Sequence, residues 1–177
     1  MMTMRRTILS LAAAATLAAG ALAQAQAPVS ALKGHNSNAP VDVTADRIEV
    51  QDRADRAIFA GNVKVRQGEL SMDTQRVTVA YASAGGIQIQ RLDASGGVIV
   101  RSPSETARGD FGIYDLDRRL ITLIGDVQLN RAGSSINGAR LVIDLDSGRA
   151  VIDGGPAGVA QSGGRVTGHF TVPQRGN

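Results

Sequence analysis

The feature that most constrains this chain is a repeated pattern in which glycine and a turn-forming residue precede two aliphatic residues that are separated by one position. The copies begin at Gly61, Gly96 and Gly125, and Gly154 continues the spacing. A repeat of about 30 residues is typical of stacked units, each of which buries its apolar face only against its neighbours. The glycines suit positions where a strand must bend, because glycine takes positive φ at little cost.

Between these glycines, apolar and polar residues alternate in short segments. Val63 and Val65 flank Lys64, for example, and Leu141 and Ile143 belong to a similar segment. Such alternation, broken about every 8–12 residues by turn-forming residues, indicates antiparallel strands. The sequence therefore predicts an all-β fold built from repeated strand units. The acidic stretches at 115–119 and 144–148 are predicted to be hairpin turns, not calcium loops.

The first residues have the features of a cleavable signal peptide. Arg5 and Arg6 precede an uncharged, alanine-rich run, and Ala21 and Ala23 form a small-x-small cleavage pattern. The alternative, a membrane anchor, would need about 20 strongly apolar residues. Removing residues 1–23 leaves 17 basic and 16 acidic residues and so lowers the net charge from +3 to +1. We therefore expect an exported protein, periplasmic or secreted, and no nucleic-acid partner.

The rest of the chain divides by composition into three parts. Residues 24–40 are small, polar and aperiodic, so we expect a flexible leader. Residues 41–155 are predicted to form one β domain. Residues 156–177 form a glycine-rich tail, in which Val166, Phe170 and Val172 could supply one edge strand.

The composition leaves little room for catalysis or a bound metal. Aromatic residues make up 3% of the chain, cysteine is absent, and the two histidines, His35 and His169, lie near opposite ends. A zinc site, a thiolate nucleophile and a Ser-His arrangement are therefore not expected. A pair of glycosidase carboxylates stays open on sequence, but such enzymes usually carry aromatic sugar platforms. We expect no enzyme and no cofactor.

Three segments together resemble a known family. They are 43–50 (VTADRIEV), 57–68 (AIFAGNVKVRQG) and 120–127 (LITLIGDV). They resemble the OstA-like family, whose members include a periplasmic bridge protein of lipopolysaccharide transport, and the resemblance covers roughly 41–153. It implies an open, twisted antiparallel β-jellyroll whose two sheets enclose an apolar groove for the acyl chains of lipopolysaccharide.

The resemblance also implies partners. Members stack head to tail and connect an inner-membrane anchored transport component with the periplasmic domain of the outer-membrane translocon. The C-terminal tail of this chain matches no motif of the family, so the end-to-end contacts are left open. A different class of function also stays open, namely a structural β-solenoid scaffold of the cell envelope with a dry interior.

Aliphatic residues at alternate strand positions are the candidates for the lining of the groove. Ordinary packing inside a β-sandwich is the alternative explanation for each of them. The candidates are Val63, Val65, Leu70, Met72, Val77, Val79, Val98, Val100, Ile113, Val127, Leu129, Ile136, Leu141 and Ile143.

Basic residues near strand ends are candidates for contacts with lipid A phosphates, because the planar guanidinium group binds phosphate through two hydrogen bonds. Arg47, Arg66 and Arg76 are the first candidates, and Lys64, Arg91 and Arg101 belong to the same set. The alternative is a solvated face whose charges protect strand edges.

Overall fold

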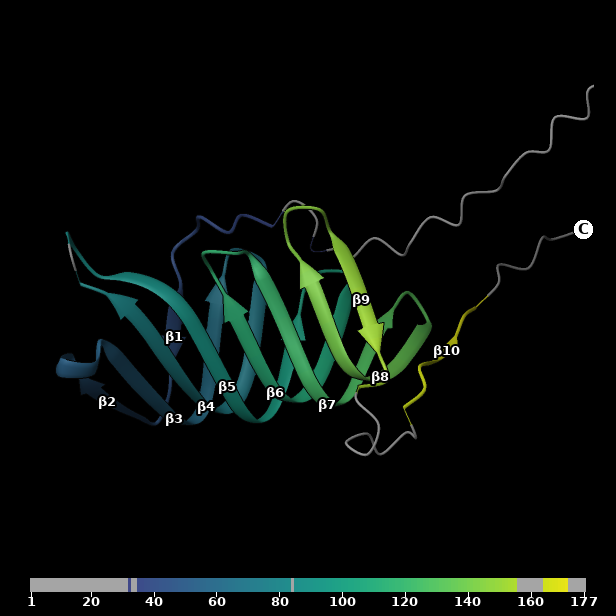
Figure 1. The fold of residues 1–177 in the computed structure, drawn as a ribbon, viewed down its shortest axis with the longest axis horizontal. Helices are drawn as coiled ribbons and strands as arrows, with labels where there is room; N and C mark the ends of the chain where they lie inside the picture. The colour runs from purple at the N-terminus through teal and green to yellow at the C-terminus, as the bar shows by residue number, and fades with distance from the viewer. Residues whose placement is uncertain (1–31, 33–34, 84, 156–163, 172–177) are drawn as a thin grey trace, which may run out of the picture.

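The computed structural model describes residues 32, 35–83, 85–155 and 164–171, and nearly all of them lie in or between β-strands (Figure 1). The predicted signal peptide and most of the predicted leader lie outside these residues. No helix in the described part is long and apolar enough to cross a membrane. The elements are β1 (Asp42–Thr44), β2 (Arg47–Gln51), a 3-10 turn (Asp52–Ala54), β3 (Arg56–Gln67), β4 (Leu70–Ala82), β5 (Gln88–Arg101), β6 (Glu105–Asp115), β7 (Leu120–Arg131), β8 (Ser134–Asp144), β9 (Arg149–Asp153) and β10 (Thr167–His169).

Strands that follow one another in the chain pair with one another from β3 to β8, and every pairing is antiparallel. Each end of this sheet is completed by two short strands. β1 and β2 both pair with β3, and β9 and β10 both pair with β8. The prediction of an all-β, open antiparallel fold is confirmed.

The long strands bend where the repeated glycines lie. The pairing register shifts between Ala60 and Val63 in β3, and equivalent shifts occur in β5 and β7. Gly61, Gly96 and Gly125 have φ of 81°, 89° and 81° at these shifts. The predicted role of the repeated glycine at a bend is therefore confirmed.

A side chain from the neighbouring strand or linker occupies the space beside each of these glycines. A Cβ atom at Gly61 would meet the carboxylate of Asp46, and one at Gly125 would meet that of Asp110. At the first bend, Asp46 accepts a hydrogen bond from Asn62 Nδ2 (2.8 Å), and its backbone N–H donates to the Gly61 carbonyl (2.9 Å). Backbone conformation and crowding together require glycine here.

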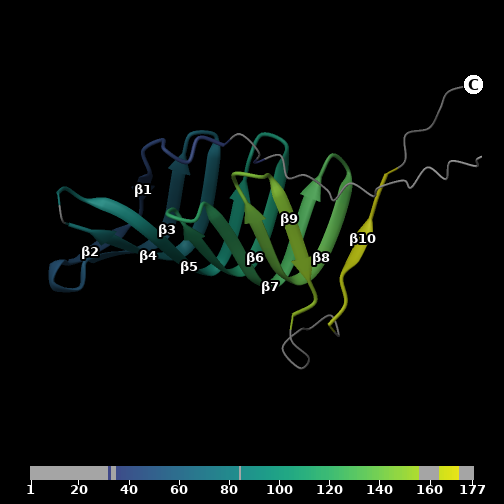
Figure 2. The same cartoon turned by 45° about the horizontal axis from the view of Figure 1, so that its top comes forward.

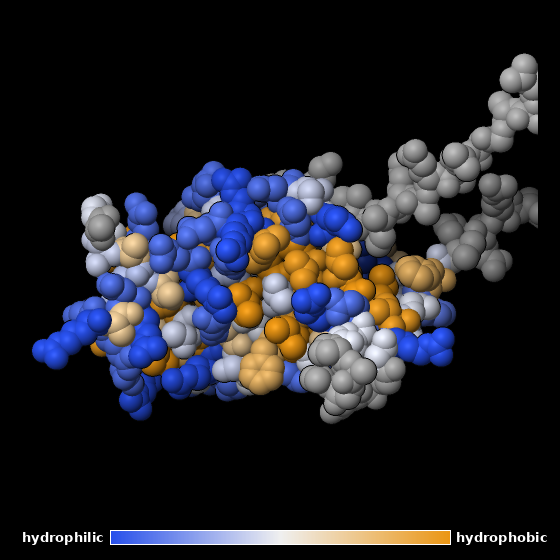
Figure 3. Space-filling view, in the orientation of Figure 1, coloured by the Kyte–Doolittle hydropathy of each residue, from blue (hydrophilic) through white to orange (hydrophobic). Residues whose placement is uncertain are grey.

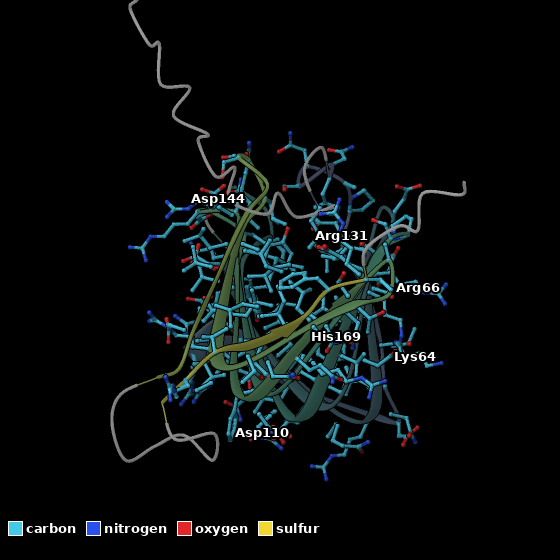
Figure 4. The ribbon with its side chains drawn as sticks, turned by 90° about the vertical axis from the view of Figure 1, so that its right-hand side faces the viewer. Lys64, Arg66, Asp110, Arg131, Asp144 and His169 are labelled. Carbon is cyan, nitrogen blue, oxygen red and sulfur yellow. The ribbon has the colours of Figure 1, made fainter. Side chains whose placement is uncertain are left out.

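The bends fold the sheet into two walls that meet along a crease and diverge on the other side. Looking along the length of the molecule, Asp110 lies at the crease, while Asp144 and Arg66 lie high on opposite walls (Figure 4). Wall A contains β2, β9 and residues 56–60, 76–82, 88–95, 111–115, 120–124 and 140–144. Wall B contains β1, β10 and residues 63–67, 70–74, 98–101, 105–108, 127–131 and 134–138.

The inner faces of the two walls form one apolar core. Leu92, Leu123 and Leu141 from wall A are completely buried, and Val98 and Val127 from wall B are almost completely so. In the described part, every buried side-chain nitrogen or oxygen has a hydrogen-bond partner. The fold is therefore stabilised by aliphatic burial between walls that share their strands.

The acidic stretches form hairpin turns, as predicted. Asp144 Oδ1 accepts hydrogen bonds from the backbone N–H groups of Asp146 (3.0 Å) and Ser147 (2.9 Å), which lowers the pKa of the Asp144 carboxyl. Asp115 Oδ1 accepts one from the backbone N–H of Arg118 (2.9 Å). These carboxylates serve as turn anchors on the rim of wall A.

The crease can be tested with two glycine substitutions that differ in crowding. Gly97→Ala imposes backbone strain alone, because φ is 80° and nothing lies within 4 Å of the added Cβ. We expect it to cost about 1–2 kcal/mol of unfolding free energy. Gly125→Ala adds a clash with Asp110, and we expect at least about 1 kcal/mol more. Urea denaturation measures both, and equal costs would show that the facing carboxylate does not constrain the bend.

Candidate functional site

Most residues predicted to line a groove lie on the inner faces of the walls and belong to one buried cluster. Their role in lipid binding stays a prediction, because burial alone also fits an ordinary core. The buried members are Val63, Val65, Leu70, Met72, Val77, Val79, Val98, Val100, Val127, Leu129, Leu141 and Ile143.

Two of the residues predicted to line a groove, Ile113 and Ile136, do not belong to this buried cluster. Ile136 lies opposite Leu129 and is half-buried near the end of the interior. The interior position expected for Ile113 is not observed. It alternates with the buried Gly112 and Tyr114, so its side chain faces the outer surface of wall A and is half-buried there, although the residue also borders the small central cavity.

The centre of the interior is filled by side chains. The cavity between the walls there measures about 10 Å³, and its lining includes Val65, Met72, Tyr114 and Leu123. This volume is about that of one water-sized probe and is too small for an acyl chain. The walls must separate if a chain is to enter this part.

The last strands border a much larger, partly open cavity of about 660 Å³. Leu129 and Ile136 of wall B and Ile152 of wall A contribute its apolar lining, and Phe170 after β10 adds a ring. A volume of this size is within the range of small-molecule sites. The charged side chains among the lining residues are Glu105, Arg131 and Arg149.

The opposite end of the interior is also uncovered. Ile48 and Val50 in β2 lie opposite Phe59 and Ala57, and therefore on the inner face, yet they are 55% and 57% exposed. Directly opposed residues share a face of the sheet. Both ends of the roll thus present apolar inner-face side chains to their surroundings.

A polar cluster connects the walls on the side opposite the crease. Gln67 of wall B is only 2% exposed, and its Oε1 accepts a hydrogen bond from the Tyr114 hydroxyl of wall A (2.6 Å). Gln67 Nε2 donates to the carbonyls of Ser37 (2.9 Å) and Ala39 (3.0 Å). Burial raises the pKa of the Tyr114 hydroxyl, against the opposing effects of a hydrogen bond with Ser37 and the charge of Arg119.

Sequence reasoning did not identify Gln67 and Tyr114 as important, although a signal existed. Gln67 is in phase with Val63 and Val65, which were predicted to face inward. A polar side chain that continues an inward-facing row needs a hydrogen-bond partner. The position of Gln67 in the alternating pattern could therefore have shown that its side chain faces inward. It could not have shown which residues this side chain contacts.

The basic residues predicted to contact phosphate lie on outer surfaces. Lys64 and Arg66 project away from the interior (Figure 4), and Arg76 is exposed near the crease. Three others form ion pairs with neighbouring carboxylates, Arg47 with Glu49, Arg91 with Asp93 and Arg101 with Asp73. Phosphate contact at these positions stays a prediction. The basic residues that border the large cavity, Arg131 and Arg149, were not among them.

Apolar side chains also reach the outer surface of wall A. Phe111 and Ile124 lie directly opposite each other and are 54% and 39% exposed, and Val151 in β9 is exposed as well. Figure 3 shows apolar side chains gathered on this face over β6 to β9. Phe111 and Ile124 face away from the interior, whereas Val151 also borders the large cavity.

An apolar probe can test whether the large cavity takes ligands. Ile136→Trp should fill part of it and weaken binding of a fluorescent fatty acid by about tenfold, which corresponds to about 1.4 kcal/mol. Ile124→Trp is the matched control on the outer surface and should change binding by less than about twofold. Fluorescence titration measures both, and equal affinities would place the probe outside this cavity.

Residues 42–149 match the family described as LptA/(LptD N-terminal domain) LPS transport protein. An uncharacterised protein of Rhizobium meliloti (strain 1021) is 33% identical over an alignment of 149 positions that covers 79% of each chain. The crystal structure of LptH from Pseudomonas aeruginosa superimposes with a TM-score of 0.68 at 18% identity, covering 78% of this chain and 99% of LptH. The chain belongs to the LptA/(LptD N-terminal domain) family of lipopolysaccharide transport proteins, which are not enzymes, as its resemblance to the OstA-like family predicted.

Proposed function

We propose that this chain is a periplasmic lipopolysaccharide-binding protein that bridges the inner and outer membranes and holds acyl chains between its two walls. The observation that carries the proposal is an aliphatic interior that is uncovered at both ends, in a chain of this transport family. LptH, which shares the fold, is described as the LptA-homologous periplasmic component of the conserved lipopolysaccharide transport device. The predicted signal peptide would deliver this chain to the same compartment.

The chemistry of the interior suits methylene chains. The core cluster is made almost entirely of aliphatic side chains, and Tyr114 is its one fully buried aromatic residue in the described part of the chain. Each CH₂ group buried there contributes about 0.8 kcal/mol without any directed polar contact. Because such contacts are nearly uniform along the roll, a lipid can move along it across small barriers.

The large cavity is where a lipid would first find space. Its apolar lining can hold an acyl chain, while Arg131 and Arg149 lie beside it with the chemistry to bind lipid A phosphates. Arg47, Arg66 and Arg76 would meet phosphate only from the outer surface of the walls. We therefore place the first phosphate contacts at the cavity and not at these three residues.

The two ends of the roll suit head-to-tail association. β2 and β10 lie at opposite ends of the molecule (Figure 2), and each is an edge strand with unpaired backbone groups. Ile48 and Val50 at one end would meet Val166 and Phe170 of a neighbouring copy. β-Augmentation of this kind would also join the ends to an inner-membrane anchored component and to the periplasmic domain of the outer-membrane translocon.

One observation favours a second candidate function. The filled centre of the roll, with its cavity of about 10 Å³, also fits a structural scaffold of the cell envelope whose interior stays dry. The two candidates differ in whether lipid ever reaches the inner faces of the central strands. Both of the following experiments separate them.

Site-specific photo-crosslinking tests contact with lipid inside living cells. A photoreactive residue at Val65 or Ile136 should capture lipopolysaccharide, because both side chains lie on inner faces. The same residue at Lys64 of wall B or Ile113 of wall A is the control, since the side chains at these positions face outward. Equal capture at all four positions, or capture at none, would contradict transport through the interior.

Depletion tests the place of the chain in transport. Cells that lose this protein should accumulate newly made lipopolysaccharide at the inner membrane, which membrane fractionation after pulse labelling measures. Re-expression of the protein should restore delivery to the outer membrane. Normal delivery in depleted cells with a weakened envelope would instead support the scaffold.

A further inference from the structure

We propose that the segment before β1 is a strap that closes the side of the roll opposite the crease and must be displaced before an acyl chain can enter between the walls. The N-terminal strap consists of Leu32 and residues 35–40. It runs from β1 along the rim towards the middle of the molecule, as both views of the ribbon show (Figures 1 and 2). This inference rests on the proposed function, because it concerns access to the same interior.

Leu32 fills part of the interior between the walls. Its side chain is only 4% exposed and belongs to the same buried cluster as the inner-face aliphatics. It comes from outside the two walls, so it occupies interior space that no strand requires. A leucine side chain and a segment of acyl chain have the same apolar chemistry, and they would compete for this space.

Gln67 provides the anchor for the strap on wall B. Both hydrogen atoms of its amide group are used, one on the Ser37 carbonyl and one on the Ala39 carbonyl. His35 Nε2 lies 3.1 Å from Gln67 Oε1, which also faces the strap. A primary amide has two donors and one acceptor oxygen, so the strap satisfies most of the hydrogen-bonding capacity of this buried side chain.

Tyr114 extends the same cluster to wall A. Its hydroxyl donates to Gln67 Oε1 across the opening, from a residue that is itself buried. The side-chain amide group of Gln67 therefore connects the strap with both walls. Losing one contact leaves a buried polar atom without its partner, which weakens the others, so strap release and wall separation are coupled.

The strap can leave without breaking a strand pairing. The backbone hydrogen bonds described for it are local, from His35 to Leu32, from Ser37 to His35 and from Ala39 to Asn36. The pairing of β1 with β3 begins only at Asp42. Displacement of the strap therefore leaves the sheet intact, as a reversible entrance requires.

Affinity for lipid tests this inference with variants that loosen the strap. Tyr114→Phe removes the hydroxyl and keeps the buried ring, and Leu32→Ala removes the competing side chain. Each should lower the Kd for fluorescently labelled lipopolysaccharide by about fivefold or more, because a larger fraction of molecules is open. Asn38→Ala, an exposed position on the same strap, is the control and should leave the Kd within about twofold of the original.

Hydrogen exchange gives an independent readout on the unaltered chain. The amides of Ser37 and Ala39 should exchange faster when lipopolysaccharide is added, because loading displaces the strap. If the protein binds lipopolysaccharide tightly, but both variants keep the original Kd and the amide exchange rates do not change, the role of the strap is contradicted. The proposed function would still stand. Absence of binding by every form of the protein would overturn the proposed function and this inference with it.

Discussion

The bends at Gly61, Gly96 and Gly125, where the backbone adopts positive φ, are the constraint on which the rest of the structure depends. Each bend divides a long strand between the two walls, so the walls are halves of one hydrogen-bonded sheet and cannot slide past each other. Their inner faces are opposed because of the bends, and aliphatic burial follows from that opposition. A chain without cysteine can hold this shape because the crease joins the walls along the whole sheet.

The crease also determines where the molecule can open. The walls are continuous at the bends but are held together at the rim by side chains, among them the contact between Gln67 and Tyr114. Separation at the rim would rotate the walls about the crease and leave the strand pairings in place. The two ends of the roll differ from both the crease and the rim. They are formed by the edge strands β2 and β10, whose unpaired backbone groups can form hydrogen bonds with another strand.

The sequence predicted the strands, the bends and the turns because each has a local signal: alternation, recurring glycine, or an aspartate that caps its own turn. The residues that face the bends, Asp46, Gln75 and Asp110, carry no glycine signal of their own, so the shift of phase within β6 was not visible in the sequence and Ile113 was expected on the inner face. The cluster of Gln67 with the strap joins residues about 30 positions apart. Its partners depend on how the finished walls approach each other, which no local pattern reports.

Magnitudes indicate that an acyl chain can compete with the strap. The four contacts of Gln67 with Tyr114, Ser37, Ala39 and His35 contribute a net of about 0.5–1.5 kcal/mol each. Burial of Leu32 adds about 1.5–3 kcal/mol. A chain of about twelve methylene groups gains about 10 kcal/mol when it is fully buried. Lipid burial can therefore outweigh the strap, whereas in the absence of lipid the same contacts keep the aliphatic interior closed to water.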